Sequence, residues 1–397
     1  MVEAVATIDP PISRTGGPSG EHGKIADIEL LRGVAILFVL VEHTWFNLVI
    51  WGSPLLIFSH TYLGLWTGVD LFFAISGFVI ARSLLPALAA SPGPRQFWRG
   101  AIAFWIRRGW RLLPSAWLWL AVMLLASIFF NRSEAFRAVS WNIEATVAAL
   151  LNVANLYVAE HIGPPPQLGA AFPYWSLSLE EQFYLLLPIV VFLARRYLPL
   201  LFGALVVLQL LLPRLDSPVL LNLRTDALLL GVLIALWSRH PTYRLCEPSS
   251  LARTRLGRCA VLALPLIVIA TMGSPVLNIV PLRLSVITLL VAALVLIASY
   301  DGDYLMRDGV LKRILLWFGS RSYALYLTHI PAFFLTRELW FRATGSDPSH
   351  GGSFAVPYVV SAYCLLVCFA ELNYRFVETP LRRKGAGIAA RLAARPA

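Results

Sequence analysis

Long apolar runs recur along the chain, separated by short polar connections. Each run approaches the roughly 20 residues that a helix needs to cross the hydrocarbon core of a bilayer. This pattern predicts an all-α integral membrane protein. The predicted spans, about ten in number, are 28–50, 62–81, 112–130, 175–194, 198–213, 219–238, 258–273, 279–300, 314–338 and 354–377.

One further apolar stretch, 141–158, is more polar than the others. It contains Asn142, Glu144, Asn152 and Asn155, and a lipid-exposed helix cannot satisfy such groups with water. We therefore expect this stretch to form an external helix that is re-entrant or interfacial instead of spanning the membrane.

Basic residues are concentrated in alternate connections, which fixes the expected orientation. Arg and Lys cluster within 95–111, 195–196, 239–258, 307–313 and 382–384. If 141–158 does not span, all these connections lie on one side, which the positive-inside rule makes the cytoplasmic side together with both termini. If it did span, every later connection would change sides.

Composition supports a membrane protein without a soluble domain. Hydrophobic residues make up 58% of the 397 residues and charged residues 14%, against about 25% charged in ordinary soluble domains. The net charge of +11 is read as a topology signal, so membrane lipids are expected partners and nucleic acid is not. The expected domains are a disordered cytoplasmic tail (1–27), the transmembrane domain (28–381) and a basic cytoplasmic tail (382–397).

Ionisable residues inside the predicted helices are candidates for a functional site, because they are costly in hydrocarbon. Arg32 and His43 lie eleven residues apart on the first helix, which places them on one face about 16 Å apart along the axis. Glu180 enters the fourth helix from the outside, at about the depth of His43. An imidazole and a carboxylate at one depth predict a general base and its orienting partner.

Four more residues reach the outer half of the membrane by the same count: Asp70, Arg224, Asp226 and His329. Each has a structural alternative. Arg224 and Asp226 could neutralise one another, and His329 could be a hydrogen-bonded packing residue. Gly68 and Gly77 around Asp70 could equally serve close helix packing.

The chemistry that this arrangement suits is acyl transfer. An outer base can activate a hydroxyl for attack on a carbonyl, and Arg, Tyr or Ser can stabilise the resulting oxyanion. Arg107, Arg108 and Arg111 lie in the aromatic and basic segment 96–113, which could be an interfacial anchor or could bind the phosphates of a cytoplasmic donor. Spacing alone leaves a transporter or flippase equally open.

Seven sequence blocks in order carry a resemblance to a known family. They are 29–35 leading to His43, then 68–78, 107–114, 174–184, 224–231, 322–329 and 371–381. Together they resemble the acyltransferase-3 family, the integral-membrane O-acyltransferases of bacterial surface polysaccharides. Within these blocks lie Trp175, Ser176, Tyr184 and Tyr326, which are expected to support the substrate or the site.

The resemblance implies acyl-CoA, usually acetyl-CoA, as donor and a glycan hydroxyl at the outer side of the bacterial inner membrane as acceptor. It makes Arg32 and His43 the essential pair and Glu180 the carboxylate of the Trp-Ser-Leu-x-x-Glu block. Acyl-CoA is then a co-substrate, and neither a metal nor a permanently bound cofactor is required. Some members carry a fused extracytoplasmic domain; because the sequence stops soon after Pro380, that domain is expected to be absent.

Several choices remain open in the sequence. The acyl group could pass directly to the acceptor or through an acyl-His43 intermediate. The acceptor could instead be a small molecule or a signalling oligosaccharide, because relatives with those acceptors share the same blocks. The external segment 131–173 is expected to select the acceptor.

Overall fold

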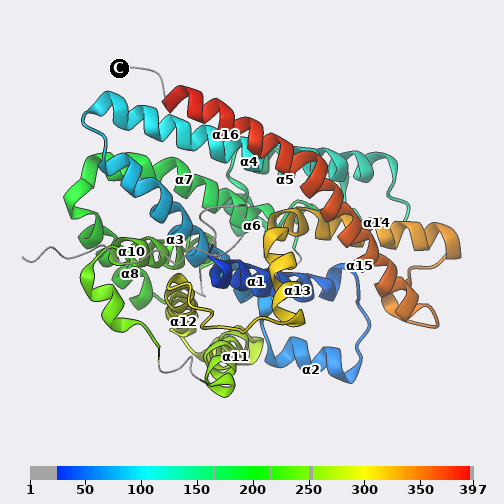
Figure 1. The fold of residues 1–397 in the computed structure, drawn as a ribbon. Coiled ribbons are helices and arrows are strands. Elements are labelled where there is room, and N and C mark those ends of the chain that lie inside the picture. Colours follow the sequence, from blue (N-terminus) through cyan, green and yellow to red (C-terminus); the bar gives the residue numbers. More distant parts are fainter. Residues whose placement is uncertain (1–24, 164–165, 215–216, 250–253, 394–397) are drawn as a thin grey trace, which may run out of the picture.

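The computed structural model describes residues 25–163, 166–214, 217–249 and 254–393, without the side chain of Arg255. The tail predicted before residue 25 lies outside these ranges. The regular elements within them are helices, packed into one bundle (Figure 1). The expected all-α class is therefore confirmed for the described residues.

The first half of the bundle contains α1 (Ala26–Asn47), α2 (Pro54–Tyr62), α3 (Gly68–Ala89), α4 (Pro94–Phe129), α5 (Val139–Leu150), α6 (Ala154–His161), α7 (Tyr174–Ala194) and α8 (Leu198–Leu211). The second half contains α9 (Pro218–Asn222), α10 (Asp226–Trp237), α11 (Arg255–Met272), α12 (Arg283–Ser299), α13 (Val310–Ser320), α14 (Ser322–Thr344), α15 (Ala355–Leu372) and α16 (Thr379–Ala393).

Several helical stretches are long and apolar enough to cross a membrane. Within the described residues there are five: Leu65–Ala89, Pro94–Phe129, Tyr174–Leu211, Pro218–Trp237 and Ala355–Ala393. Two shorter apolar helices, Leu256–Met272 and Arg283–Ser299, accompany them. The protein is thus a multi-pass membrane protein, while the count of ten spans and the sidedness of the termini stay predictions.

Three predicted boundaries differ from the structure. The segment 96–113 is not a separate interfacial helix, because it continues through Pro114 into the 36-residue helix α4. The expected span 314–338 is two helices, α13 and α14, which meet at Arg321. The basic segment after 381 belongs to α16, which packs along α4 (Figure 1).

The ambiguous stretch 141–158 forms two short helices, α5 and α6. They contain 12 and 8 residues, and at about 1.5 Å per residue neither is long enough to cross a bilayer. Asn152 between them has a φ of 56°, a left-handed conformation that ends the first helix. This agrees with the expectation that the stretch does not span.

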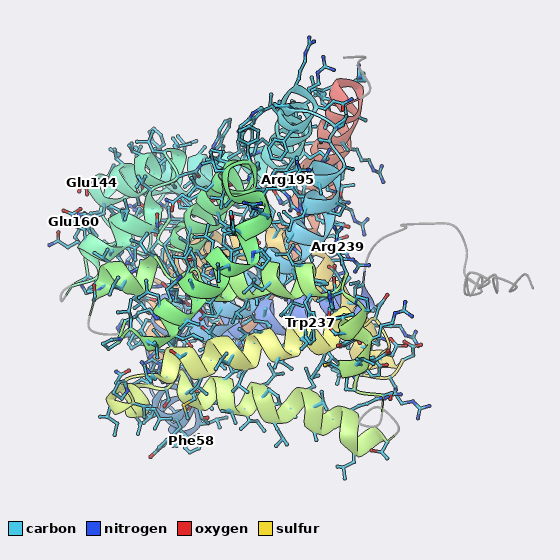
Figure 2. The ribbon with its side chains drawn as sticks, turned by 90° about the vertical axis from the view of Figure 1, so that its left-hand side faces the viewer. Phe58, Glu144, Glu160, Arg195, Trp237 and Arg239 are labelled. Carbon is cyan, nitrogen blue, oxygen red and sulfur yellow. The ribbon has the colours of Figure 1, made fainter. Side chains whose placement is uncertain are left out.

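Figure 2 shows Glu144 and Glu160 at the left edge of the bundle, Phe58 at its bottom, and Arg195 and Arg239 nearer its middle. The sidedness of the connections stays a prediction.

Glycines let the helices that carry the polar residues approach their neighbours closely. A Cβ atom added at Gly77 of α3 would overlap the carbonyl oxygen of Leu228 in α10, and one at Gly231 of α10 would overlap that of Ala74 in α3. The same reciprocal arrangement joins α1 to α13 at Gly33 and Gly319. Small residues at such crossings are the usual means of close packing in membranes.

We expect Gly77→Leu to destabilise the bundle by at least about 1–3 kcal/mol, because the new side chain forces α3 away from α10. The measurement is the thermal unfolding of the detergent-purified protein. Gly203→Leu on α8 is the matched control, since no atom lies within 4 Å of a Cβ there. Equal unfolding temperatures for the two variants would contradict the close crossing.

Candidate active site

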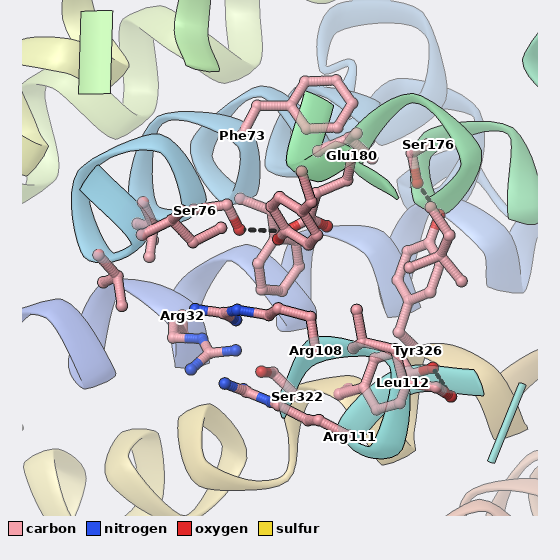
Figure 3. A pocket seen from close by; sticks show the side chains of 18 residues that line it. Arg32, Phe73, Ser76, Arg108, Arg111, Leu112, Ser176, Glu180, Ser322 and Tyr326 are labelled. Carbon is pink, nitrogen blue, oxygen red and sulfur yellow. Dashed lines mark hydrogen bonds between the residues drawn. The ribbon is translucent and has the colours of Figure 1, made fainter. Parts of the chain in front are cut away.

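A pocket lies among α1, α3, α4, α7 and α14, inside the bundle (Figure 3). Residues with polar or charged side chains line it, among them Arg32, Ser76, Arg108, Arg111, Ser176, Glu180, Tyr184 and Ser322. The walls between these groups are apolar and aromatic, and Tyr323 and Tyr326 belong to them.

Three guanidinium groups gather on one side of the pocket. Arg32 comes from α1. Arg108 and Arg111 come from one face of α4, because they are three residues apart. The Arg108 guanidinium carbon lies 5.3 Å from the ring centroid of Tyr184. Nε of Arg32 and Nε of Arg111 are buried without a hydrogen-bond partner among the described residues. The pocket is therefore a cationic cavity with donor groups to spare.

Glu180 faces this cationic side and interacts electrostatically with the same three arginines. It accepts hydrogen bonds from the hydroxyl groups of Ser76 and Tyr184. Within the described part of the chain no hydrogen bond joins it to His43. The predicted pairing of His43 with Glu180 is therefore wrong: equal depth along two helix axes does not bring two side chains together.

The partner of His43 is His329 on α14. His43 Nδ1 lies 2.7 Å from His329 Nε2, and the two rings are nearly parallel, with their centroids 4.9 Å apart. The ring of Phe172, from the segment before α7, makes a T-shaped contact with His43, with the ring centroids 5.3 Å apart. His329, which could have been a packing residue alone, is thus in direct contact with the candidate base.

Tyr326 connects the pocket to this histidine pair. Its hydroxyl group lines the pocket side and lies 2.7 Å from Oγ of Ser176. One turn further along α14, Nδ1 of His329 lies 2.6 Å from the carbonyl oxygen of Tyr326. The cationic pocket and the histidine pair are therefore neighbours, although His43 itself does not line the pocket.

Asp70 and Arg224 form a buried ion pair outside the pocket. Nε of Arg224 donates to Oδ1 of Asp70 at 2.7 Å and its NH2 group donates to Oδ2 at 3.2 Å. The guanidinium also lies over the ring of Trp175, 4.9 Å from its centroid. These contacts tie the start of α3 to α7 and to the break before α10.

Asp226 has a different partner from the one considered in the sequence. It accepts a hydrogen bond of 2.7 Å from Arg214 and one of 2.8 Å from Thr288. Neutralisation of Asp226 by Arg224 is therefore wrong, because each residue has its own opposite charge. Arg214 was missed by sequence reasoning, since it lies in a connection and not in an apolar run.

The positions of Arg107 and Glu378 change the set of candidate residues for the pocket. Arg107 is exposed and does not line the pocket, unlike Arg108 and Arg111. Glu378, which sequence reasoning left without a role, is 3% exposed and interacts with Arg111 and Arg32. Its π-helical turn, Asn373–Glu378, belongs to the last of the seven sequence blocks, which was the available signal.

Comparison with known proteins identifies the class. The model of the acyltransferase domain family matches residues 25–371, so the chain belongs to this family, and the resemblance seen in the seven blocks is confirmed. No solved structure matches.

Named relatives extend across most of this chain. A putative peptidoglycan O-acetyltransferase, YrhL of Bacillus subtilis, is 27% identical over 390 residues, which are 92% of this chain and 56% of the relative. The peptidoglycan O-acetyltransferase OatA of Listeria monocytogenes is 27% identical over 385 residues, 91% of this chain and 56% of that protein. O-acetyltransferase OatA of Staphylococcus aureus is 27% identical over 352 residues, with 81% and 53% covered. The chain thus spans about half the length of these relatives.

We expect Asp70→Asn to lower stability by about 3–5 kcal/mol, because the buried Arg224 loses its counter-charge. Thermal unfolding in detergent measures this loss. Glu160→Gln, which removes an exposed carboxylate, is the control. Adding Arg224→Gln to Asp70→Asn should restore part of the stability, because no buried charge is then left unpaired. If Asp70→Asn is as stable as Glu160→Gln, the ion pair does not stabilise the fold.

Proposed function

We propose that this protein is a multi-pass membrane O-acyltransferase of the bacterial inner membrane. It transfers an acyl group, specifically acetyl, from cytoplasmic acyl-CoA to a hydroxyl group of a glycan at the outer side. The observation that carries the proposal is the adjacency of the cationic pocket to the His43–His329 pair through Tyr326. A site for an anionic thioester donor thereby adjoins a site for a base.

The donor side of the reaction uses the arginines. The phosphates of CoA are anions that guanidinium groups bind in bidentate fashion, and Arg108 and Arg111 have their guanidinium groups in the pocket. Arg32, whose Nε has no partner among the described residues, would guide the thioester end of the donor. Glu180 would hold the three cations in place instead of orienting His43.

The acceptor side uses His43. In the direct version of the reaction, His43 accepts the proton of the acceptor hydroxyl as its oxygen attacks the thioester carbonyl. The carbon–sulfur bond then breaks, and the leaving CoA thiolate takes a proton from the imidazolium. Tyr326 donates its hydroxyl proton to the carbonyl oxygen of Pro173 at 2.8 Å and therefore accepts from Ser176. The candidate donor to the oxyanion is Arg32, whose Nε has no partner among the described residues.

The names of the relatives suggest which acceptor to test first. Two of them are named as peptidoglycan O-acetyltransferases, so peptidoglycan strands are the first acceptor to test, ahead of other surface polysaccharides and small molecules. Mass spectrometry of cell-surface glycans, with and without the gene, should show the loss of an acetyl mass on the true acceptor.

His43→Ala should abolish acetyl transfer from labelled acetyl-CoA in membranes, because the hydroxyl loses its base. Transfer to glycan and release of free CoA thiol are measured together, with thermal unfolding as the test of folding. His240→Ala, which changes an exposed histidine, is the matched control. Undiminished transfer by His43→Ala would overturn the mechanism, and glycan movement without CoA release would indicate a transporter.

Arg108→Gln should raise the KM for acetyl-CoA by roughly 10-fold or more, since a charge-assisted contact to phosphate contributes about 1.5–3 kcal/mol. The exposed Arg95 on the same helix provides the control, because Arg95→Gln makes the same charge change outside the pocket. Steady-state kinetics in proteoliposomes gives both values. Equal KM values would exclude Arg108 from donor binding.

A further inference from the structure

The hydrogen bonds of the histidine pair between α1 and α14 determine which ring nitrogens carry protons. His329 is fully buried and uses both ring nitrogens: Nδ1 faces the Tyr326 carbonyl oxygen at 2.6 Å and Nε2 faces His43 Nδ1 at 2.7 Å. A carbonyl oxygen can only accept a hydrogen bond. The proton of a neutral His329 must therefore be on Nδ1.

The position of the proton on His329 also determines the position of the proton on His43. With its proton on Nδ1, the Nε2 atom of neutral His329 has only a lone pair and must accept. His43 must then carry its own proton on Nδ1 and donate it to His329. The consequence is that Nε2 of His43 has a free lone pair, which is the protonation state that a general base needs.

Building on the proposed function, we propose that His329 is a positioning residue: it fixes His43 in the Nδ1-protonated form and so leaves Nε2 as the base. A protonated His329 would reverse this order, because both its nitrogens would donate and His43 would hold its proton on Nε2. That charged state has no carboxylate partner among the described residues, because no ion pair of His329 occurs there.

Neighbouring aromatic rings and a backbone hydrogen bond hold His43 and His329 in position. Phe172 packs edge-on against His43, and Phe333 packs edge-on against His329, with centroids 6.1 Å apart. The α1 backbone at His43 is also held, since its carbonyl oxygen accepts a hydrogen bond of 2.9 Å from Asn47. When His43 takes up the substrate proton, its Nδ1–H continues to donate to His329, which spreads the new charge towards the Tyr326 carbonyl.

This role replaces the one first expected of Glu180. In hydrolases with a serine nucleophile, a carboxylate orients the base and stabilises the charge that forms on it. Here a neutral imidazole, itself oriented by a backbone carbonyl, provides the orientation without placing a carboxylate in the apolar layer. The cost of a buried unpaired charge in the resting state is thereby avoided.

Two substitutions of His329 distinguish a role in positioning His43 from a role in packing alone. His329→Gln can present an amide oxygen near the place of Nε2, so it can still accept from His43. His329→Asn is shorter and reaches only the place of Nδ1, so it keeps the contact to Tyr326 and loses the one to His43. We expect kcat to fall on the order of 10²-fold in the Asn variant and to be largely retained in the Gln variant, with KM for acetyl-CoA unchanged in both.

A spectroscopic measurement tests the same point without activity. Nitrogen-15 NMR of histidine-labelled protein reports which ring nitrogen carries the proton, and the His43→Gln spectrum identifies the signals of His43. We expect wild-type His43 to be protonated at Nδ1 and not at Nε2 near neutral pH, and the His329→Asn variant to lose this preference.

The outcomes distinguish this inference from the function on which it rests. Glycan movement without release of CoA would overturn the proposed function, and full transfer activity of His43→Ala would overturn the assignment of His43 as the base, whereas the protonation pattern would still be measurable in both cases. A requirement for His43 together with an Nε2-protonated wild-type ring, or with equal kcat in the Gln and Asn variants, would overturn the inference alone. If the Asn variant fails to fold, the wild-type spectrum still decides.

Discussion

The bilayer offers no water to polar groups, and this constraint organises the whole structure. Every charge placed among the helices needs a partner from the protein itself. Arg224 with Asp70 and Arg214 with Asp226 form short, buried ion pairs. Some buried polar atoms still lack a hydrogen-bond partner in the described residues, among them Nε of Arg214 outside the pocket and Nε of Arg32 and of Arg111 at the pocket. The ion pairs hold the bundle together, and the pocket is a place where two guanidinium groups with unpaired nitrogens line one cavity.

Close helix crossings give those charges their positions. The glycine pair of α1 and α13 holds the helix that carries Arg32 and His43, and the pair of α3 and α10 holds the helix that carries Ser76. Rigid crossings of this kind matter for a transfer reaction, because small misplacements of reacting groups cost large factors in rate. The packing of small residues is therefore part of how the site is built, even where it lies outside the pocket.

Sequence reasoning recovered the helical class and the family, because apolar length and ordered blocks are local properties. It could not recover which side chains meet. Counting residues along an axis gives depth but not rotation about that axis, so Glu180 was paired with His43 although its partners are Ser76 and Tyr184. Arg214 was missed because it lies in a connection, although its partner Asp226 is only 12 residues away. The role of Glu378 was missed because its interactions with Arg32 and Arg111 join elements distant in sequence.

Glu180 and His43, which the sequence analysis paired, belong to two different parts of the site. Glu180 belongs to the cationic pocket, where a carboxylate can balance three arginines and leave room for an anionic donor. His43 is paired with His329 instead, and among the described residues neither ring has a hydrogen bond to a carboxylate. In the proposed mechanism, the base gains a charge only when it takes the substrate proton. Helix α14 carries both Tyr326 and His329, so a single helix positions the wall of the cationic pocket relative to the histidine pair.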